Sequence, residues 1–121
     1  MNKDLIEKLL LALLSDGSCK QESQDMTGEY VIVRCRDAGV HAGTLVSLKG
    51  REVVLTESRR LWYWKAGGNE HSLSGVARNG LADGKIAGSV ERIILPEACE
   101  VISTTTTARE SISGYKIHQA D

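Results

Sequence analysis

The sequence predicts an α+β fold, a mainly antiparallel β-sheet accompanied by short helices, and three observations lead to this prediction. Runs rich in β-branched residues recur along the chain, with glycine-containing turns between them. Two later segments carry the cap and stop residues of short helices. The elements follow in the order of several strands, a short helix, two more strands and a final helix, which is typical of an α+β domain. At 121 residues, the chain can bury a core without disulfide or metal support.

The first part of the chain is predicted to form a helix over residues 2–15, followed by a polar linker. Three leucines recur there at helical spacing, namely Leu5, Leu9 and Leu13. Gly17 is a suitable stop for this helix. Its apolar face either packs on the domain or contacts a second copy of the chain. We therefore divide the chain into an N-terminal helix and linker, residues 1–28, and an α+β domain, residues 29–121.

Several segments of the domain are predicted to be strands, and they cover residues 30–36, 44–48, 51–56, 60–64, 90–95 and 99–103. Residues 49–50 are expected to form a hairpin turn, and residues 57–58 a second turn. Pro96 separates the last two strands. Residues 81–88 contain two glycines and are predicted to be a loop.

The first strand alternates between apolar and basic side chains. Val31, Val33 and Cys35 are expected on one face, and Arg34 and Arg36 on the other. The two arginines belong either to a solvated surface or to an anion-binding site.

The first short helix of the domain is predicted over residues 70–79. Asn69 is its expected N-cap, and Gly80 is its expected stop. The side chains expected to face inward are Leu73, Val76 and Ala77.

The second short helix is predicted over residues 107–113. Thr107 and Glu110 fit a capping box, with Thr107 as the N-cap. Arg109 then lies in the first turn, where a cation opposes the helix dipole. A phosphate bound at this helix end would compensate the charge; the alternative is an ordinary C-terminal helix.

Residues 59–64, with the sequence RRLWYW, are the strongest candidate for a functional site. The chain has only five aromatic residues, and three of them are adjacent here. Strand alternation places Arg60, Trp62 and Trp64 on one face. A cation beside ring surface suits a planar base attached to a phosphate. The alternative is that the tryptophans fill a small core and the arginines are solvated.

A connection of small residues, 37–43, follows the first strand. Its glycines permit a tight turn or a close backbone approach to a ligand, and the spacing of a dinucleotide-binding loop is missing. His41, expected in this loop, is either a ligand contact or polar surface.

The composition excludes several classes of function. A formal net charge of −1 argues against general nucleic-acid binding, so we expect no DNA partner. The three cysteines form no CxxC pair and predict no metal site; Cys35 and Cys99 are expected to be buried thiols. Catalytic signatures such as HExxH and GxSxG are missing, so we expect neither an enzyme nor a cofactor. The longest apolar run is too short to cross a membrane, and a cytosolic location is expected.

Three stretches together resemble a known family. They are YVIVR with DAGVHAGTL (residues 30–34 and 37–45), RRLWYW with SLS (residues 59–64 and 72–74), and TARESI (residues 107–112). In combination they are similar to the first type of phage anti-Thoeris proteins, over about residues 30–112. These proteins sequester the signalling nucleotide of a bacterial immune system.

The resemblance implies a non-catalytic protein of the host bacterial cytoplasm. It would bind glycocyclic ADP-ribose and leave it intact, and some members also capture cyclic di- or trinucleotides of the CBASS pathway. It also implies dimers that associate into hexamers, with ligand pockets between protomers. By motif, Arg109 and either Arg59 or Arg60 would contact phosphate, and residues 62–64 would lie near the base or the interface.

The complete set of expected ligand-binding residues is Arg34, Asp37, Ala38, Gly39, His41, Arg59, Arg60, Trp62, Tyr63, Trp64, Thr107 and Arg109. An alternative class is a small phage structural or assembly module whose tryptophans lie in a subunit interface.

Overall fold

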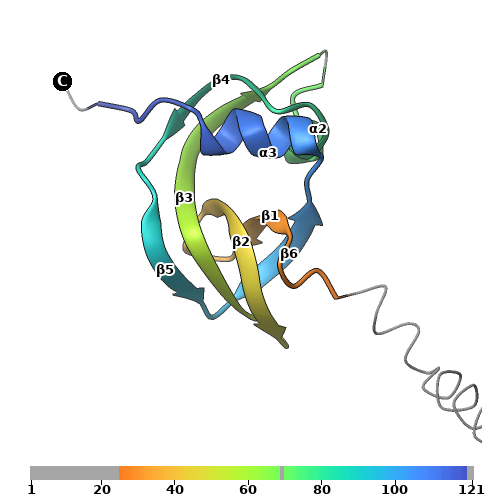
Figure 1. Ribbon diagram of the computed structural model, residues 1–121, viewed down its shortest axis with the longest axis vertical. Helices are drawn as coiled ribbons and strands as arrows, with labels where there is room; N and C mark the ends of the chain where they lie inside the picture. Colours follow the sequence, from red (N-terminus) through yellow and green to blue (C-terminus); the bar gives the residue numbers. More distant parts are fainter. Residues whose placement is uncertain (1–24, 69, 120–121) are drawn as a thin grey trace, which may run out of the picture.

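The computed structural model describes residues 25–68 and 70–119 (Figure 1). The predicted helix over residues 2–15 lies outside this part of the chain. The elements are β1 (Tyr30–Cys35), β2 (Val40–Lys49), β3 (Glu52–Ala66), α2 (Leu73–Asn79), β4 (Leu81–Ile86), β5 (Val90–Leu95), β6 (Ala98–Ser103) and α3 (Thr106–Ser113). None of the helices described has the length and apolar character that crossing a membrane requires.

The strands form one antiparallel sheet, so the predicted α+β class with a mainly antiparallel sheet is confirmed. The strand order is β4-β3-β2-β1-β6, and β5 pairs with the first half of β3. The sheet curls, because β5 continues through a short turn into β6, which pairs with β1 on the other side (Figure 1). At this junction the Ala98 amide donates to the Arg51 carbonyl over 2.9 Å.

Both faces of the sheet bury apolar side chains. Ile32 belongs to a cluster with residues of α2 and α3, which cover one face. Its neighbours Val31 and Val33 belong to a second cluster, built from strands inside the curl. Cys35 lies in this second cluster as well, so the alternation predicted for the first strand is confirmed. Cys99, in contrast, is exposed and not buried as expected.

The long strand β3 contains a bulge where a turn was predicted. Glu57 has a φ of +51°, yet the strand continues through it, because Ser58 pairs with Val90 of β5. The opposite strand must approach closely here. A Cβ at Gly43 would lie 2.9 Å from the Thr56 carbonyl oxygen, so only glycine fits. Beyond the bulge, Ser58 and Arg59 are both buried.

Two further expectations between β3 and β5 need correction. Residues 81–86 form β4 and not a loop, because they pair with the edge of β3 from Leu61 to Ala66. The helix α2 begins at Leu73, and its N-cap is Ser72, whose side chain accepts from the Gly75 amide. The expected cap Asn69 lies outside the described residues. The predicted stop at Gly80 is confirmed.

The helix α3 is capped by Thr105 and not by Thr107. The Thr105 hydroxyl accepts from the Ala108 amide and donates to the Arg78 carbonyl at the end of α2. The Thr105 amide also donates to Ala77. These bonds fix Thr105 at the start of α3, so that Thr107 lies within the helix and is exposed.

Candidate functional site

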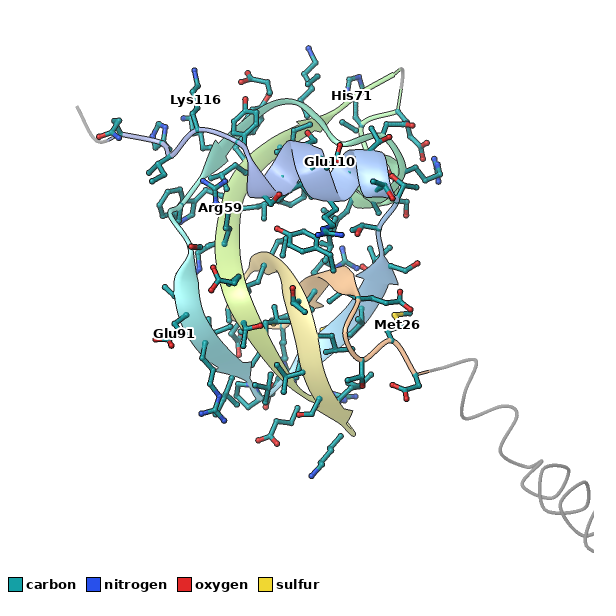
Figure 2. The ribbon with its side chains drawn as sticks, in the orientation of Figure 1. Met26, Arg59, His71, Glu91, Glu110 and Lys116 are labelled. Carbon is teal, nitrogen blue, oxygen red and sulfur yellow. The ribbon has the colours of Figure 1, made fainter. Side chains whose placement is uncertain are left out.

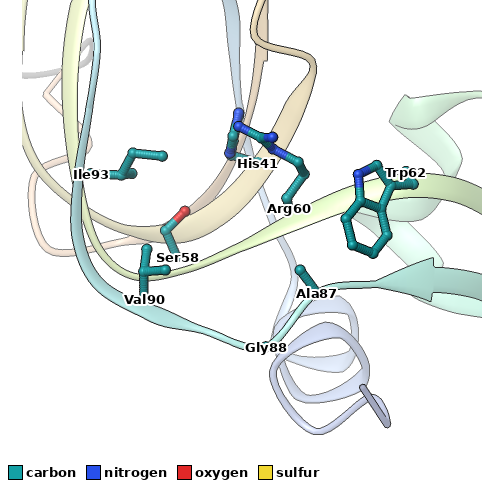
Figure 3. A pocket seen from close by; sticks show the side chains of 8 residues that line it. All are labelled: His41, Ser58, Arg60, Trp62, Ala87, Gly88, Val90 and Ile93. Atoms are coloured by element: carbon teal, nitrogen blue, oxygen red, sulfur yellow. The ribbon is translucent and has the colours of Figure 1, made fainter. Parts of the chain in front are cut away.

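Two adjoining pockets lie along the second half of β3, and they share Arg60 and Trp62. The first, which we call the loop pocket, has a volume of about 360 Å³. Six predicted site residues line it: Asp37, Ala38, Gly39, Arg60, Trp62 and Trp64. The second, which we call the serine pocket, has a volume of about 220 Å³ and includes His41 and Ser58 in its lining (Figure 3).

The pairing of β2 with β3 brings the loop and the aromatic strand together. Arg60 pairs with His41, and Leu61 pairs with Val40 at the end of the β1–β2 turn. Gly39, at a φ of +86°, closes this turn, and its carbonyl accepts from the Cys35 amide. The backbone of the turn thus borders the loop pocket.

Leu61 and Trp62 of β3 point to opposite faces of the sheet, as strand alternation predicts, but the alternation does not continue beyond them. Leu61 enters the core under the helices, whereas Trp62 is 57% exposed. A register shift between Leu61 and Tyr63 then changes the pattern, and Trp64 packs partly against the helix-covered core. The Trp62 ring also packs edge-on against the His118 ring, with their centroids 6.1 Å apart. Trp62 is therefore the more accessible of the two indoles.

His41 lies in β2 and is buried, so it is not the loop residue that the sequence suggested. Its Nε2 is 2.9 Å from the Ala38 carbonyl oxygen. Because a carbonyl can only accept, Nε2 carries the hydrogen. Burial lowers the pKa of His41, and the nearby Arg60 cation lowers it further, against the opposing effect of the Ala38 bond. A neutral His41 thus holds Ala38 in the loop pocket wall.

Arg59 has a different environment from its neighbour Arg60. It is 5% exposed and lies at the end of α3 from which the C-terminal segment leaves (Figure 2). Its Nε donates to the Ala87 carbonyl over 2.7 Å, and its Nη1 donates to Ile112 over 2.9 Å and to Tyr115 over 2.6 Å. The last carbonyls of a helix have no amide partners within the helix, and the Arg59 guanidinium donates hydrogen bonds to them. We assign it as a structural clamp and not as the phosphate contact that the sequence allowed.

Arg109 lines a third cavity, which we call the threonine pocket, with a volume of about 350 Å³. Tyr30 and Thr104 also line it, and its surface is largely polar. The Tyr30 hydroxyl is buried without a partner among the described residues. Burial raises the pKa of Tyr30 to about 12, although the Arg59 and Arg109 cations oppose the shift.

The threonine pocket shares no lining residue with the loop and serine pockets in the described part of the chain. Arg60 and Arg109, which were expected to contact one ligand, therefore lie in different pockets of a single chain. Besides Arg59, three other expected residues line none of these three cavities. Arg34 pairs with Glu100 over 3.2 Å, and Tyr63 and Thr107 are exposed elsewhere.

Sequence reasoning missed Ser58, which was expected in a turn. Its hydroxyl is buried in the lining of the serine pocket and has no hydrogen-bond partner among the described residues. No sequence pattern marks such a residue, because a small polar side chain in a strand is equally common on a solvated face. Among the described residues, no three His, Cys, Asp or Glu side chains gather in a way that could hold a metal ion.

These features define a small α+β domain with ligand-sized cavities, two of them meeting at a guanidinium and an indole. Residues 28–112 match the model of a family described as a domain of unknown function (DUF6948), and the chain belongs to this family. The match spans every residue named above in the three pockets. Comparison with curated proteins finds no match to the chain.

Proposed function

We propose that this protein binds a cyclic nucleotide immune signal and holds it without degrading it. The ligand class is glycocyclic ADP-ribose, with cyclic di- or trinucleotides of the CBASS pathway as further ligands. In this role the protein is a phage immune-evasion factor of the host bacterial cytoplasm. The observation that carries the proposal is that Arg60, Trp62 and Trp64 line one pocket together with the turn residues Asp37 and Gly39. A fork of N–H donors beside two indoles suits a base linked to phosphate.

The energies of these contacts bear on whether one chain is enough. A charge-assisted bond from Arg60 contributes about 1.5–3 kcal/mol, and stacking on the indoles contributes about 1–3 kcal/mol per base. For one base they together supply about 2.5–6 kcal/mol before the costs of association, whereas a nanomolar dissociation constant needs about 12 kcal/mol. A cyclic ligand is rigid and loses little entropy, but further contacts are still required. This shortfall favours a pocket to which a second chain contributes.

Homo-oligomerisation is therefore part of the proposal, as dimers that associate into hexamers. The exposed apolar side chains near the pockets, Trp62, Val90 and Ile117, offer a surface for such contacts. Arg109 of one protomer would then join Arg60 of its partner around one ligand. Mixing Arg60→Met and Arg109→Met chains tests this directly, because a mixed dimer regains one site with both arginines. Restored binding in the mixture supports a shared site, and binding as poor as in either variant alone contradicts it.

The direct test of sequestration uses the protein and a glycocyclic ADP-ribose. After incubation and removal of free ligand, the protein is denatured by heat and the released molecule is identified by mass. Unaltered ligand supports sequestration, a degraded product indicates an enzyme, and no released ligand refutes binding. At a hundredfold ligand excess over the dissociation constant, the complex should gain about 2.7 kcal/mol of stability. Arg60→Met should lose this gain, and the control Arg92→Met should keep it, because Arg92 is exposed on β5 and lines none of the pockets described.

The exposure of Trp62 and Tyr63 favours a second candidate, a phage structural or assembly module with an aromatic subunit interface. This candidate predicts that Trp62→Ala dissociates the oligomer, while saturating nucleotide does not raise the melting temperature. Sequestration predicts that nucleotide raises the melting temperature of the wild-type protein. The melting measurement separates the candidates, because both of them place Trp62 in a subunit contact.

A further inference from the structure

The serine pocket contains a buried polar group whose partner is missing. Ser58 is only 2% exposed, and its hydroxyl makes no hydrogen bond to any described residue. Figure 3 shows the hydroxyl oxygen directed into the pocket, on the side where His41 and Arg60 lie. A buried hydroxyl without a partner destabilises the free protein, and most native structures avoid one. A ligand that supplies the missing bond would remove this penalty.

The remaining walls of the pocket suit a flat, largely apolar group. Val90, Ile93 and Ala87 form one part of the lining, and the Trp62 indole forms another. The volume of about 220 Å³ exceeds the roughly 150 Å³ that is enough for a benzene ring. This volume is sufficient for one planar system of one or two rings. Arg60 stands where this pocket meets the loop pocket and can bind an anionic group attached to the ring.

We infer that the serine pocket is the base subsite, which takes a nucleobase and reads its polar edge with the Ser58 hydroxyl. The inference rests on the proposed function and adds to it the location of the base and the residue that recognises it. A serine hydroxyl both donates and accepts, so it pairs with a ring nitrogen, a carbonyl oxygen or an amino group of the base. The sugar and phosphate then extend past Arg60 into the loop pocket.

The first variant, Ser58→Ala, separates recognition from folding. Removing an unpartnered hydroxyl should leave the melting temperature of the free protein unchanged or higher. The affinity for a glycocyclic ADP-ribose should nevertheless fall about 5- to 100-fold, because the bond that removed the penalty is lost. Ser74→Ala is the matched control. Ser74 is exposed on α2 and lines none of the three pockets, so this variant should bind like the wild type.

The second variant blocks the subsite from its rim. Val90 is 48% exposed and lines the serine pocket, so Val90→Trp places an indole over the cavity without disturbing the core. Binding of a glycocyclic ADP-ribose should fall at least about 100-fold. Val46→Trp is the control, because Val46 is 45% exposed on β2 and lines none of the pockets described. This control should keep wild-type affinity.

Titration calorimetry on the five proteins separates failure of the subsite from failure of the function. Wild-type affinity in both Ser58→Ala and Val90→Trp overturns the base subsite and leaves sequestration standing. A wild-type protein that binds neither a glycocyclic ADP-ribose nor a cyclic dinucleotide overturns both proposals. Loss of affinity in Ser58→Ala with a clear fall in its melting temperature also overturns the inference, since the hydroxyl would then have a structural role.

Discussion

Replacing Arg59 with methionine removes a guanidinium that joins the C-terminal segment to the sheet. The side chain donates to carbonyls of Ala87, Ile112 and Tyr115 at 2.6–2.9 Å. A weaker contact to Ser113 is 3.4 Å long. Methionine fills a similar volume but has no donor, so these carbonyls all lose the guanidinium, although the Ile112 carbonyl keeps the Tyr115 amide as a donor.

The expected loss of folding stability in Arg59→Met follows from the number of hydrogen bonds that are removed and from the burial of the Arg59 side chain. Hydrogen bonds of a charged donor contribute about 1.5–3 kcal/mol each. Their full sum is not expected, because the Ser113 carbonyl lies in an exposed residue and water can replace part of the interaction. A buried acceptor that loses its donor costs about 1–3 kcal/mol, and the carbonyls of Ala87 and Tyr115 both lose the guanidinium, so we expect Arg59→Met to cost about 2–6 kcal/mol. That is a large share of the 5–15 kcal/mol by which a domain of this size is stable.

Urea unfolding followed by tryptophan fluorescence measures this loss. Arg60→Met is a control at the adjacent position; since Arg60 is exposed, its effect should stay within about 0.5 kcal/mol. Hydrogen exchange adds a local readout, because the His118 amide, bonded to the Ile86 carbonyl, should exchange faster in Arg59→Met. A loss below about 1 kcal/mol with unchanged exchange at His118 would refute the role of Arg59 as a clamp.

Three other perturbations test the fold around the pockets. Thr105→Ala should cost about 1–2 kcal/mol in urea unfolding, because it removes the cap of α3, while Thr107→Ala should change stability by less than about 0.5 kcal/mol; equal effects would contradict the cap assignment. Gly43→Ala should cost at least about 1–3 kcal/mol, because its Cβ would meet the Thr56 carbonyl oxygen at 2.9 Å and backbone cannot yield easily; a neutral result would contradict the close approach. The pKa of His41 is lowered in the folded state, so the unfolded chain binds a proton first as the pH falls below about 6.5, and folding stability should decrease there. His41→Gln should flatten this part of the pH profile, and an unchanged profile would assign the dependence to other groups.

The strands that the sequence predicts well are those that carry their own signal. The hairpin between β2 and β3 is marked by apolar runs on both sides of Gly50, whose φ is +62°. The strand β4 has no such signal, because Asp83, Gly84 and Lys85 have low β-propensity. It forms because the edge of β3 offers hydrogen-bond partners, and the backbone of β3 comes so close that a Cβ at Gly84 would lie 3.0 Å from the Tyr63 carbonyl oxygen. Pairing with a distant segment is information that a local pattern does not contain.

The loop pocket could be predicted from the sequence, because it lies between two strands that follow each other in the chain. The serine pocket could not be predicted in this way. Two consecutive strands that pair antiparallel bring the turn before one, residues 37–39, close to the end of the other, residues 60–64. Ser58 depends instead on the bulge at Glu57, which the sequence shows only as a break between two strands. A positive φ at Glu57 fits either a turn or a bulge. The pairing of Ser58 with Val90 shows that the strand continues past Glu57, so this position is a bulge.

Arg59 and Arg60 show how far the sequence alone can carry a functional argument. The resemblance left either of them as the phosphate contact, although strand alternation already placed Arg60 on the same face as Trp62 and Trp64. Alternation sends their side chains to opposite faces of β3, but the face that becomes the core depends on where α3 ends. Because that end lies beside Arg59, the Arg59 side chain donates to a carbonyl at the helix end. Arg60 lies on the other face and lines a pocket with Trp62. The same strand thus supplies the structural contact of Arg59 and the pocket contact of Arg60. Variants at Arg59 should therefore change the stability of the protein, and variants at Arg60 should change ligand binding.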